Sequence, residues 1–392
     1  MSEQNGEISK LVGVIREGVQ HWNEWRRQNR SQVMLRGANL EDTNLRGANL
    51  SDCILDNVKL GGCDLTDADF SGSSLMSCDF DRATIDRTSF HGVNLNLANF
   101  ARTKFSGANF GSARTYWIDF SGFDFRKSTF VRTQFGTAIL RNANFEGVDL
   151  TGSNLTRAQI SDTRFYRARL VGANFRGANL ARTEFIESDL TNAKLKKAKF
   201  GEAKFVKSNL ENVELSECNL RGLDFSGASF RGSDLSFTNL RDCNLEGADV
   251  TDAWLWESQR SGWRIKGIKC EQAYWDRDRN ELVKYQPGDF ERAYSEKHQI
   301  VLAFPGGISA VEVAMLPLML ERLQLEYEGA TLHIRSVVDE GRGRLSQSPL
   351  RIGRTEVRLI SLVRDENCKA SYTPRCTRLR LGPASPGVLK HN

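Results

Sequence analysis

The feature that most constrains the fold of this chain is a five-residue period in its apolar side chains. At every fifth position from 35 to 255 the residue is Leu, Phe, Ile or Val, with Thr115 as the single exception. The residue two places before each of these centres is commonly small, as at Ala38, Cys53 and Ala68. Such a period matches neither the roughly 3.6 residues per turn of an α-helix nor the alternation of a strand. The chain must therefore turn at fixed intervals, which indicates a solenoid.

Several of the five-residue units have the same form. Arg36-Gly-Ala-Asn-Leu40, Thr66-Asp-Ala-Asp-Phe70 and Arg176-Gly-Ala-Asn-Leu180 are examples. These units resemble the motif A-(D/N)-(L/F)-X-X of the pentapeptide-repeat family, and the resemblance covers well over half of the chain without an insertion. It implies a mainly β fold, a right-handed quadrilateral parallel β-helix in which four pentapeptides form one square coil.

Elementary packing supports such a coil. One large side chain on each side points to the axis, a small one fills the slot beside it, and the other positions face water. Gly and Asn suit the tight corners, because these need a positive φ or a side chain that bonds its own backbone. Successive coils should pair as parallel strands about 4.8 Å apart, so roughly eleven coils make a rod of about 50 Å. Burial of each centre residue contributes about 1.5–3 kcal/mol before the entropy of ordering is subtracted.

The chain has 392 residues, so we expect more than one domain. We predict an N-terminal amphipathic capping helix over residues 1–30 and the β-helix over 31–255. A Trp-rich cap and linker follows over 256–280, then a small α/β module over 281–363 and a basic tail without regular structure over 364–392.

The ends of a solenoid expose apolar surface and must be covered. Before the repeats, one helical face carries Ile8, Leu11, Val12, Ile15, Val19 and Trp22. We interpret this segment as a cap folded over the first coil, and a free amphipathic helix for a membrane or a partner is the alternative. Beyond the repeats the five-residue phase continues through Ile265, Cys270 and Trp275, which should close the last coil.

The module after residue 281 matches no family that we recognise. Pro287-Gly-Asp-Phe-Glu-Arg-Ala-Tyr predicts a short helix, and residues 309–328 predict a longer one with a kink at Pro317. Three segments predict strands: residues 298–304, 330–337 and 356–363.

Cysteine usage and hydropathy bear on the compartment. Five of the eight cysteines occupy the small inward position, namely Cys53, Cys63, Cys78, Cys218 and Cys243. They are typical of buried small side chains, which favours a reducing, bacterial cytoplasm. No apolar run approaches the roughly 18 residues of a membrane helix, and no signal peptide opens the sequence. We therefore predict a cytoplasmic protein without membrane attachment.

No arrangement of residues predicts catalysis. The five histidines are scattered, and there is no HExxH, GxSxG, GxGxxG or Walker motif. Cys270, Cys368 and Cys376 lack CxxC spacing, so a zinc site is disfavoured. The prediction is a chain without enzymatic activity, cofactor or metal; if chemistry exists, it lies in the C-terminal module.

Charge is placed unevenly along the chain. The whole chain carries +5, and residues 342–392 alone have 11 Lys+Arg against 3 Asp+Glu, which is +8 and leaves 5 − 8 = −3 for the rest. Nucleic-acid binding is therefore disfavoured except through the basic tail.

Some members of the pentapeptide-repeat family are thought to imitate duplex DNA and bind type II topoisomerases. Full imitation over a 50 Å rod would need about 30 net negative charges. Residues 31–255 hold 28 acidic and 27 basic side chains, so mimicry by the whole rod is disfavoured. Only the first coils are acidic. The candidate residues for this alternative are Asp42, Asp52, Asp56, Asp64 and Asp67.

A second candidate surface is basic. It consists of Arg164, Arg167, Arg169, Lys194, Lys196, Lys197 and Lys199. No aromatic residues interleave with its lysines, as a single-strand binder would require. Its partner would be acidic, although an ordinary solvated surface explains the same residues.

Residues 20 apart should stack in columns on the rod. One such column alternates in sign and predicts a self-neutralised face, with chance placement as the alternative: Lys104, Asp124, Asn144, Arg164, Glu184, Lys204 and Asp224. The irregularity at Thr115-Tyr116-Trp117 indicates a bulge or a docking spot. Taken together, the sequence predicts an interaction scaffold for a protein partner, and the topoisomerase-binding DNA mimic is the alternative. Caps at both ends favour a monomer, and a dimer is the alternative.

Overall fold

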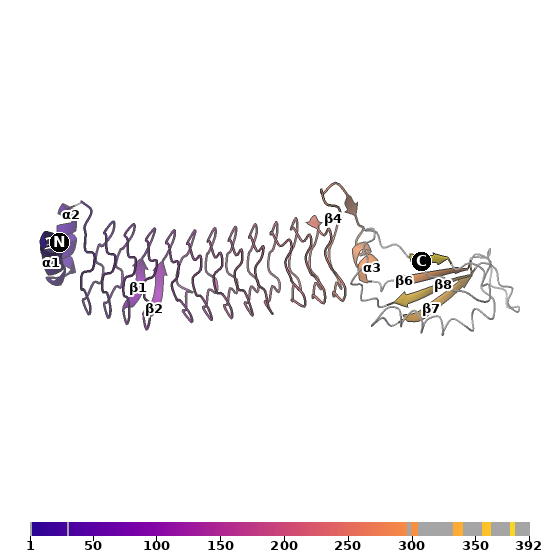
Figure 1. Cartoon of the computed structure of the whole chain (residues 1–392), viewed down its shortest axis with the longest axis horizontal. Coiled ribbons are helices and arrows are strands. Elements are labelled where there is room, and N and C mark those ends of the chain that lie inside the picture. Colours follow the sequence, from indigo (N-terminus) through magenta and orange to yellow (C-terminus); the bar gives the residue numbers. More distant parts are fainter. Residues whose placement is uncertain are drawn as a thin grey trace. The chain divides into compact units, whose positions relative to one another are not determined.

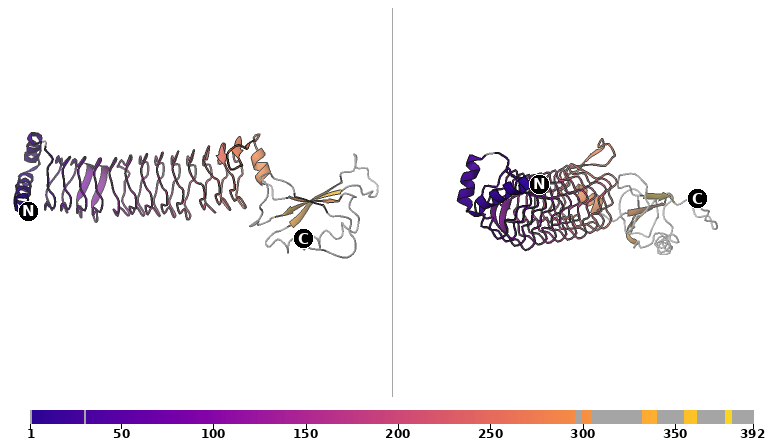
Figure 2. Two further views of the ribbon diagram at one scale, coloured as in Figure 1. Left: turned by 45° about the horizontal axis from the view of Figure 1, so that its top comes forward. Right: turned by 60° about the vertical axis from the view of Figure 1, so that its left-hand side comes forward.

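The repeat region is a stack of coils with a period of 20 residues. The computed structural model describes residues 2–29 and 31–295 together with the strands at 299–304, 332–339, 355–361 and 377–380. Parallel bridges join neighbouring coils, for example Asn39 to Lys59 (59 − 39 = 20) and Lys59 to Asp79. Figure 1 shows the coils from the side, and the right-hand view of Figure 2 shows their angular outline. The predicted solenoid, in which four units superpose, is confirmed.

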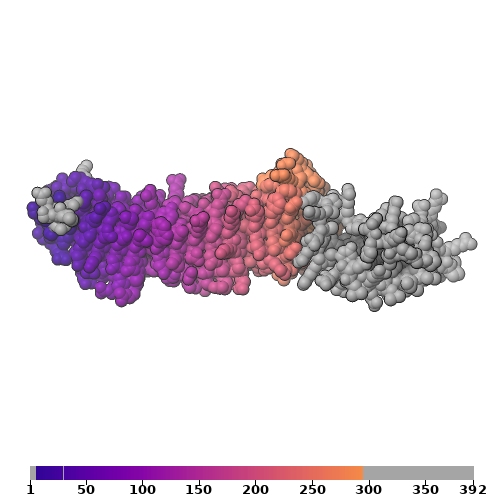
Figure 3. Space-filling model, in the orientation of Figure 1, coloured from indigo at the N-terminus to yellow at the C-terminus, as the bar shows by residue number. Residues whose placement is uncertain are grey.

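The core of the rod is a filled column of side chains. The rings of Phe145, Phe165 and Phe185 stack on one another with centroids 5.1 Å apart at both steps. Between residues 35 and 255 every centre residue is buried except Phe105, which is half buried. Offset or stacked aromatic pairs add about 0.5–1.5 kcal/mol each to the free energy gained from burial. On the outside, Figure 3 shows one face of the rod as a continuous packed surface.

The corners of the coils are tight turns in which one residue has a positive φ. In the turn after Leu45, Gly47 has φ 70° and the Ala48 N–H donates to the Leu45 carbonyl at 2.9 Å. Gly and Asn were expected at this position, but Arg167 (φ 54°) and many other charged residues also occupy it. A non-glycine residue in this conformation costs roughly 1–2 kcal/mol. Bonds between coils offset the cost, as where the Arg167 N–H donates to the Ile186 carbonyl at 3.0 Å.

The N-terminal cap consists of two helices, α1 (Ser2–Arg16) and α2 (Val19–Gln28), rather than the single helix that the sequence predicted. The break lies at Gly18, whose φ of 127° is readily adopted only by glycine. Leu11, Ile15 and Trp22 of the predicted apolar face are buried. The two helices lie at the end of the rod that begins the stack (Figure 1).

The cap replaces hydrogen bonds that a preceding coil would supply. In the second coil the carbonyls of Lys59, Asp69 and Ser71 accept backbone N–H groups from the first coil at 2.7–2.9 Å. The equivalent carbonyls of the first coil have no coil before them. They accept hydrogen bonds from side chains of the cap instead. Arg16 donates to the Asn39 carbonyl at 3.3 Å, Trp22 Nε1 to that of Asn49 at 2.8 Å and Arg26 to that of Ser51 at 2.8 Å. A buried carbonyl without a donor would cost about 1–3 kcal/mol, so these donors stabilise the exposed end.

At the other end of the rod the predicted phase continues. Ile265, Cys270 and Trp275 are 2%, 8% and 1% exposed, as expected of inward positions. The Trp275 indole donates to the Tyr285 hydroxyl at 2.8 Å, and the Arg260 guanidinium lies 4.5 Å from the Trp275 ring. These aromatic contacts close the last coil.

A short sheet ends the solenoid. Strand β3 (Ala253–Trp254) pairs in parallel with β4 (Gln272–Tyr274), which pairs antiparallel with β5 (Leu282–Lys284). The antiparallel strand breaks the parallel pattern of the coils. Two longer strands of six residues each lie within the rod, β1 (Thr84–Ser89) and β2 (Lys104–Asn109), and they pair in parallel with two register shifts.

The second compact unit starts at Asp289, so β5 belongs to the first unit although the sequence predicted the α/β module from residue 281. It contains helix α3 (Asp289–Ser295) and a sheet of order β7-β8-β6-β9, in which β6 pairs antiparallel with β8 and parallel with β9. The strands are β6 (Gln299–Phe304), β7 (Leu332–Asp339), β8 (Thr355–Ser361) and β9 (Thr377–Arg380).

The short helix and the three predicted strands are present, whereas the helix predicted over 309–328 lies outside the described residues. Strand β9 falls in residues 364–392, where the sequence predicted no regular structure. The alternation in Thr377-Arg-Leu-Arg380 suits a strand, and pairing with β6 supplies the backbone partners. In the described part of the chain, no helix combines the length and apolar character needed to cross a membrane.

Candidate interaction surface

The interior of the rod holds thiols and hydroxyls that are already hydrogen bonded. In the small inward slot, Cys63 Sγ donates to the Leu40 carbonyl at 3.0 Å, and Ser73 and Thr163 make the same contact to the carbonyl 23 residues earlier. Burial raises the pKa of the Cys63 thiol to about 11 and that of Cys78 to about 12. The five slot cysteines are buried and free, as predicted. The slot selects Cys, Ser and Thr for this bond as well as for their size.

The acidic candidates do not gather on one face. Asp42 and Asp52 are exposed and lie half a coil apart (52 − 42 = 10), at opposite corners. Asp56 pairs with Arg36 at 3.0 Å, and Asp67 pairs with Arg87 at 2.7 Å and Arg46 at 3.5 Å.

The pKa values of two of these carboxyls reflect their partners. The hydrogen bond from Arg87 lowers the pKa of Asp67. The hydroxyl of Thr66, 2.6 Å from Asp64, lowers the pKa of that carboxyl. Both carboxyls therefore stay ionised, and it is the paired arginines that offset part of the negative charge of these coils.

The basic candidates also divide into two groups. Arg167 and Lys197 are one and a half coils apart (197 − 167 = 30), so the arginines and the lysines occupy opposite corners. Arg164, Arg167 and Lys196 form ion pairs with Glu184, Glu187 and Glu217 at 3.9, 2.8 and 2.9 Å. The remaining members are exposed and form no ion pair within the described residues: Arg169, Lys194, Lys197 and Lys199.

The predicted self-neutralised column is present over part of its length. Glu184 pairs with Lys204 at 3.1 Å on one neighbouring coil and with Arg164 at 3.9 Å on the other. Asp124, in contrast, pairs with Arg126 of its own coil at 2.6 Å. Exposed pairs of this kind contribute about 0.2–1 kcal/mol each.

An apolar corner, which the sequence indicated only at Tyr116-Trp117, stands out from this charged surface. Leu97 and Trp117 occupy the same corner on successive coils and are 56% and 63% exposed. Met76, in the coil before Leu97 and at the adjoining position of the turn, is 39% exposed. The three span two coil spacings, about 10 Å. The sequence did contain a signal for this corner, because Leu97 and Trp117 are apolar residues 20 apart at an outward position of the repeat.

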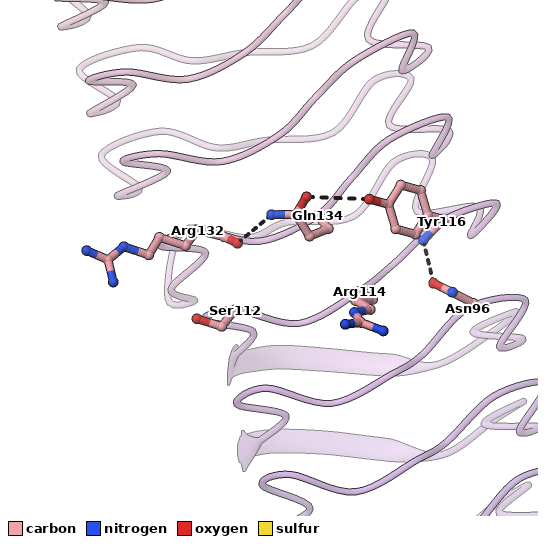
Figure 4. Close-up of a pocket in the computed structure, with 6 residues that line it drawn as sticks. All are labelled: Asn96, Ser112, Arg114, Tyr116, Arg132 and Gln134. Atoms are coloured by element: carbon pink, nitrogen blue, oxygen red, sulfur yellow. Dashed lines mark hydrogen bonds between the residues drawn. The ribbon is translucent and has the colours of Figure 1, made fainter.

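Beside this corner lies an open hollow of about 650 Å³, lined by six polar or aromatic residues (Figure 4): Asn96, Ser112, Arg114, Tyr116, Arg132 and Gln134. Tyr116 donates its hydroxyl to Gln134 Oε1 at 3.4 Å and its backbone N–H to Asn96 Oδ1 at 3.1 Å. Its ring covers Gly136, where a Cβ would come within 2.5 Å of a ring carbon. Asn96 therefore holds the Tyr116 backbone from the preceding coil, and Gln134 and Gly136 of the next coil orient its ring.

The exception at Thr115 has a packing explanation. Thr115 is fully buried, and so is Ile118, which occupies the slot that usually holds a small residue. Ile118 is the slot residue before Phe120, so a large slot residue follows the small centre residue directly along the chain. The Thr115 hydroxyl also donates to the Gln134 carbonyl at 3.1 Å.

Among the described residues, no group of three or more His, Cys, Asp or Glu side chains is placed to hold a metal ion. The geometry thus defines a class of protein: a solenoid of stacked four-unit coils with a filled axis and its variable side chains outside.

The chain belongs to the pentapeptide-repeat family. The model described as pentapeptide repeat region matches residues 63–138 and 178–255. The model described as pentapeptide repeats (8 copies) matches residues 34–72, 130–167 and 158–196. Together these matches run from residue 34 to residue 255, which confirms the resemblance found in the sequence. No curated protein matches the chain.

Solved structures of other pentapeptide-repeat proteins are similar to this chain. HetL, involved in heterocyst differentiation regulation in the cyanobacterium Nostoc, is 23% identical with a TM-score of 0.33, over 64% of this chain and 94% of its own. QnrB1, a plasmid-mediated fluoroquinolone resistance protein, is 20% identical with a TM-score of 0.18, over 61% of this chain and 92% of its own. A pentapeptide-repeat protein of the Arabidopsis thaliana thylakoid lumen is 28% identical with a TM-score of 0.14, over 32% and 70%.

Proposed function

We propose that the chain is a non-enzymatic scaffold that binds a protein partner through the outer surface of its solenoid. The observation that supports this proposal is the filled axis. Centre residues such as Phe130 and Leu150 are 0% exposed, so the repeat region has no interior space for a substrate. Recognition then falls to side chains at the corners and along the sides, where a rigid rod presents them at fixed spacing. We take the coil to be right-handed, as the family resemblance implies, and the compartment to be a reducing cytoplasm that suits the free buried thiols.

The alternative partner is a type II topoisomerase bound by the acidic first coils. The ion pairs of Asp56 and Asp67 weaken this proposal, because each offsets negative charge that duplex imitation would need. The second unit and its basic tail add a separate contact in either case.

Capture from a lysate of the native cells tests the scaffold proposal. The bait is the full chain, and the matched control bait is the full chain unfolded by Phe165→Asp. We expect one protein, identified by mass spectrometry, to be enriched on the folded bait alone. Equal recovery on both baits would contradict the proposal.

A gyrase supercoiling assay separates the two partners. We expect no inhibition at micromolar concentrations of the chain. Inhibition that disappears when Asp42 and Asp52 are changed to Asn would establish the topoisomerase alternative.

A further inference from the structure

Resting on the proposed scaffold function, we propose that one corner of the rod binds an extended, acidic segment of a protein partner. The recognition corner consists of Leu97 and Trp117, the hollow beside them with Arg114 and Arg132, and the exposed cations Arg157 and Lys197 further along the same corner. The segment seats an apolar side chain against Leu97 and Trp117 and directs its carboxylates at the cations.

The apolar anchor is exposed and held in place. The Leu97 N–H donates to the Tyr116 carbonyl at 3.2 Å, which ties the two coils together at the corner. Trp117 has φ 58°, a conformation that costs a bulky side chain roughly 1–2 kcal/mol, and its ring centroid lies 5.8 Å from that of Tyr116. Because Tyr116 is fixed by Asn96, Gln134 and Gly136, it gives Trp117 a rigid ring to pack against and itself loses little freedom on binding. Trp, Tyr and Arg are also the residues most enriched at binding hot spots.

Charge determines the occupant. Arg114, Arg132, Arg157 and Lys197 are exposed, and none forms an ion pair within the described part of the chain. Other arginines of this part of the rod are paired, as Arg87 is with Asp67 and Arg102 with Asp81. In Figure 4 the Arg132 side chain extends away from the other residues that line the hollow, so its guanidinium is open to a partner. A surface with several unpaired cations beside an apolar anchor is complementary to carboxylates next to an apolar side chain.

The repeat gives the segment a direction and a spacing. Arg157 lies two coils beyond Trp117, about 10 Å, and Lys197 lies four coils beyond it, about 19 Å. An extended chain advances roughly 3.3 Å per residue. Carboxylates about three and about six residues after the apolar anchor would therefore face the two cations.

A nucleic acid fits this corner less well. Duplex DNA carries one negative charge per about 1.7 Å, whereas Arg157 and Lys197 lie two coils, about 10 Å, apart along the corner. Trp117 offers one ring for base stacking, but its neighbours Leu97 and Met76 are not aromatic, so a second base would find no ring beside it. Glu217 occupies the same corner one coil beyond Lys197 and would repel phosphate.

Fluorescence anisotropy with the full chain tests the proposal. The probe is a labelled peptide of about ten residues with one Phe followed by Glu at the third and sixth places after it. Control peptides carry Ser for Phe, or Gln for both Glu. We expect the probe to bind and each control to bind about tenfold more weakly or worse. Failure of the probe to bind at millimolar concentration, or equal binding of all three peptides, would overturn the proposal.

Variants then locate the site. We expect Trp117→Ala and the double variant R114Q/R132Q each to lower affinity for the probe about tenfold or more. The double variant R157Q/K197Q should lower it about threefold to tenfold and flatten its salt dependence. The matched control is Lys207→Gln, an exposed lysine at the opposite corner (207 − 197 = 10), which should leave binding unchanged. Unchanged binding in both W117A and R114Q/R132Q would place the site elsewhere.

Two further arms complete the test. The variant R114E/R132E should bind a peptide with Lys in place of Glu, because the charges are exchanged; no gain would contradict charge recognition. A single-stranded oligonucleotide that competes more strongly than the peptide would replace the protein partner with a nucleic acid. Circular dichroism and thermal melting should show that all variants remain folded, since every substituted side chain is exposed.

The lysate capture distinguishes failure of this site from failure of the proposed function. A partner retained equally by wild type and Trp117→Ala would leave the scaffold in place and reject the corner. A partner that wild type retains and Trp117→Ala does not would support both the scaffold function and the recognition corner. If neither bait retains a partner, the scaffold itself fails.

Discussion

The coils between residues 140 and 210 and those between residues 84 and 137 follow the same five-residue period but pack differently. In the first region every slot holds a small residue or Val, and the rings of Phe165, Phe185 and Phe205 stack with centroids 4.9–5.1 Å apart. In the second region the slots at Ile118 and Phe123 hold large residues.

The second region accommodates the two large slot residues in different ways. Before Ile118 the centre residue is the small Thr115, and both residues are fully buried. At Phe123 no centre residue shrinks. The Phe123 ring lies 5.6 Å from that of Phe105, both rings are half buried, and the nearby backbone of β1 and β2 shifts register. The comparison teaches that the coils accommodate a large slot residue in two ways, with a small centre residue next to it in the chain or with partial exposure of the crowded rings.

Removal of a ring from the regular stack should have the largest effect. Phe165→Ala deletes a fully buried ring between two stacked neighbours, so we expect the free energy of unfolding to fall by about 3–5 kcal/mol. Phe105→Ala, the same substitution at the half-buried position, should cost less than half as much. Urea denaturation followed by circular dichroism measures both. Equal losses would remove the distinction between the two regions.

Restoration of the consensus residue at the exception should destabilise the rod. Thr115→Leu adds volume beside Ile118, and overpacking of this kind costs about 1–3 kcal/mol. The double variant T115L/I118A returns the pair to the common pattern and should come within about 1 kcal/mol of wild type. Denaturation of the single and double variants gives the coupling energy. Additive losses would show that Thr115 and Ile118 do not share one volume.

Much of the fold could be predicted because the period alone determines which side chains face the axis. Two features could not. The break at Gly18 interrupts an apolar face that continues from Ile15 to Trp22, and the sequence contains no other sign of it. Charged residues such as Arg167 take a positive φ because bonds between coils hold them there, which local preference does not reveal.

The candidate surface was less predictable for a related reason. Spacing by 20 residues predicts which side chains are neighbours, and Glu184 does pair with Lys204. It does not predict which neighbour a charged side chain pairs with, because that depends on side-chain rotamers. Asp124, for example, forms its ion pair with Arg126 of its own coil. The same spacing places Leu97 beside Trp117. Only Trp117 lies next to a break in the five-residue period, at Thr115, so only Trp117 drew notice in the sequence.

The buried thiols make the stability of the rod depend on pH, and they lie on both sides of the irregular coils, with Cys78 before them and Cys218 after them. Burial raises the pKa of Cys78 from 9.0 to about 12 and that of Cys218 from 9.0 to about 11. The unfolded chain therefore loses these protons first as pH rises above 9, so stability present below pH 9 is lost as pH rises through the native pKa. For Cys218 the loss at pH 10 is about 1 kcal/mol. Cys218→Ser, which keeps a donor for the Leu195 carbonyl, should flatten the fall in unfolding free energy between pH 9 and 11. An identical pH profile in the variant would mean that the thiol is not held neutral in the folded rod.

The smallest effect should follow removal of the extra ring from the irregular region. Phe123 contacts Phe105, Phe120 and Phe125 at centroid distances of 5.4–5.6 Å but is itself half buried. In Phe123→Ala, the loss of partial burial is offset by relief of the crowded slot, because nearby coils hold small residues at this position, namely Ala83, Thr103 and Ala143. We expect the free energy of unfolding to change by less than about 1 kcal/mol, against the several kcal/mol expected for Phe165→Ala. Urea denaturation of the two variants side by side measures the difference. A loss at Phe123 as large as that at Phe165 would make Phe123 an ordinary core residue, and the half-buried Phe105 would then need a cause other than an overfilled slot.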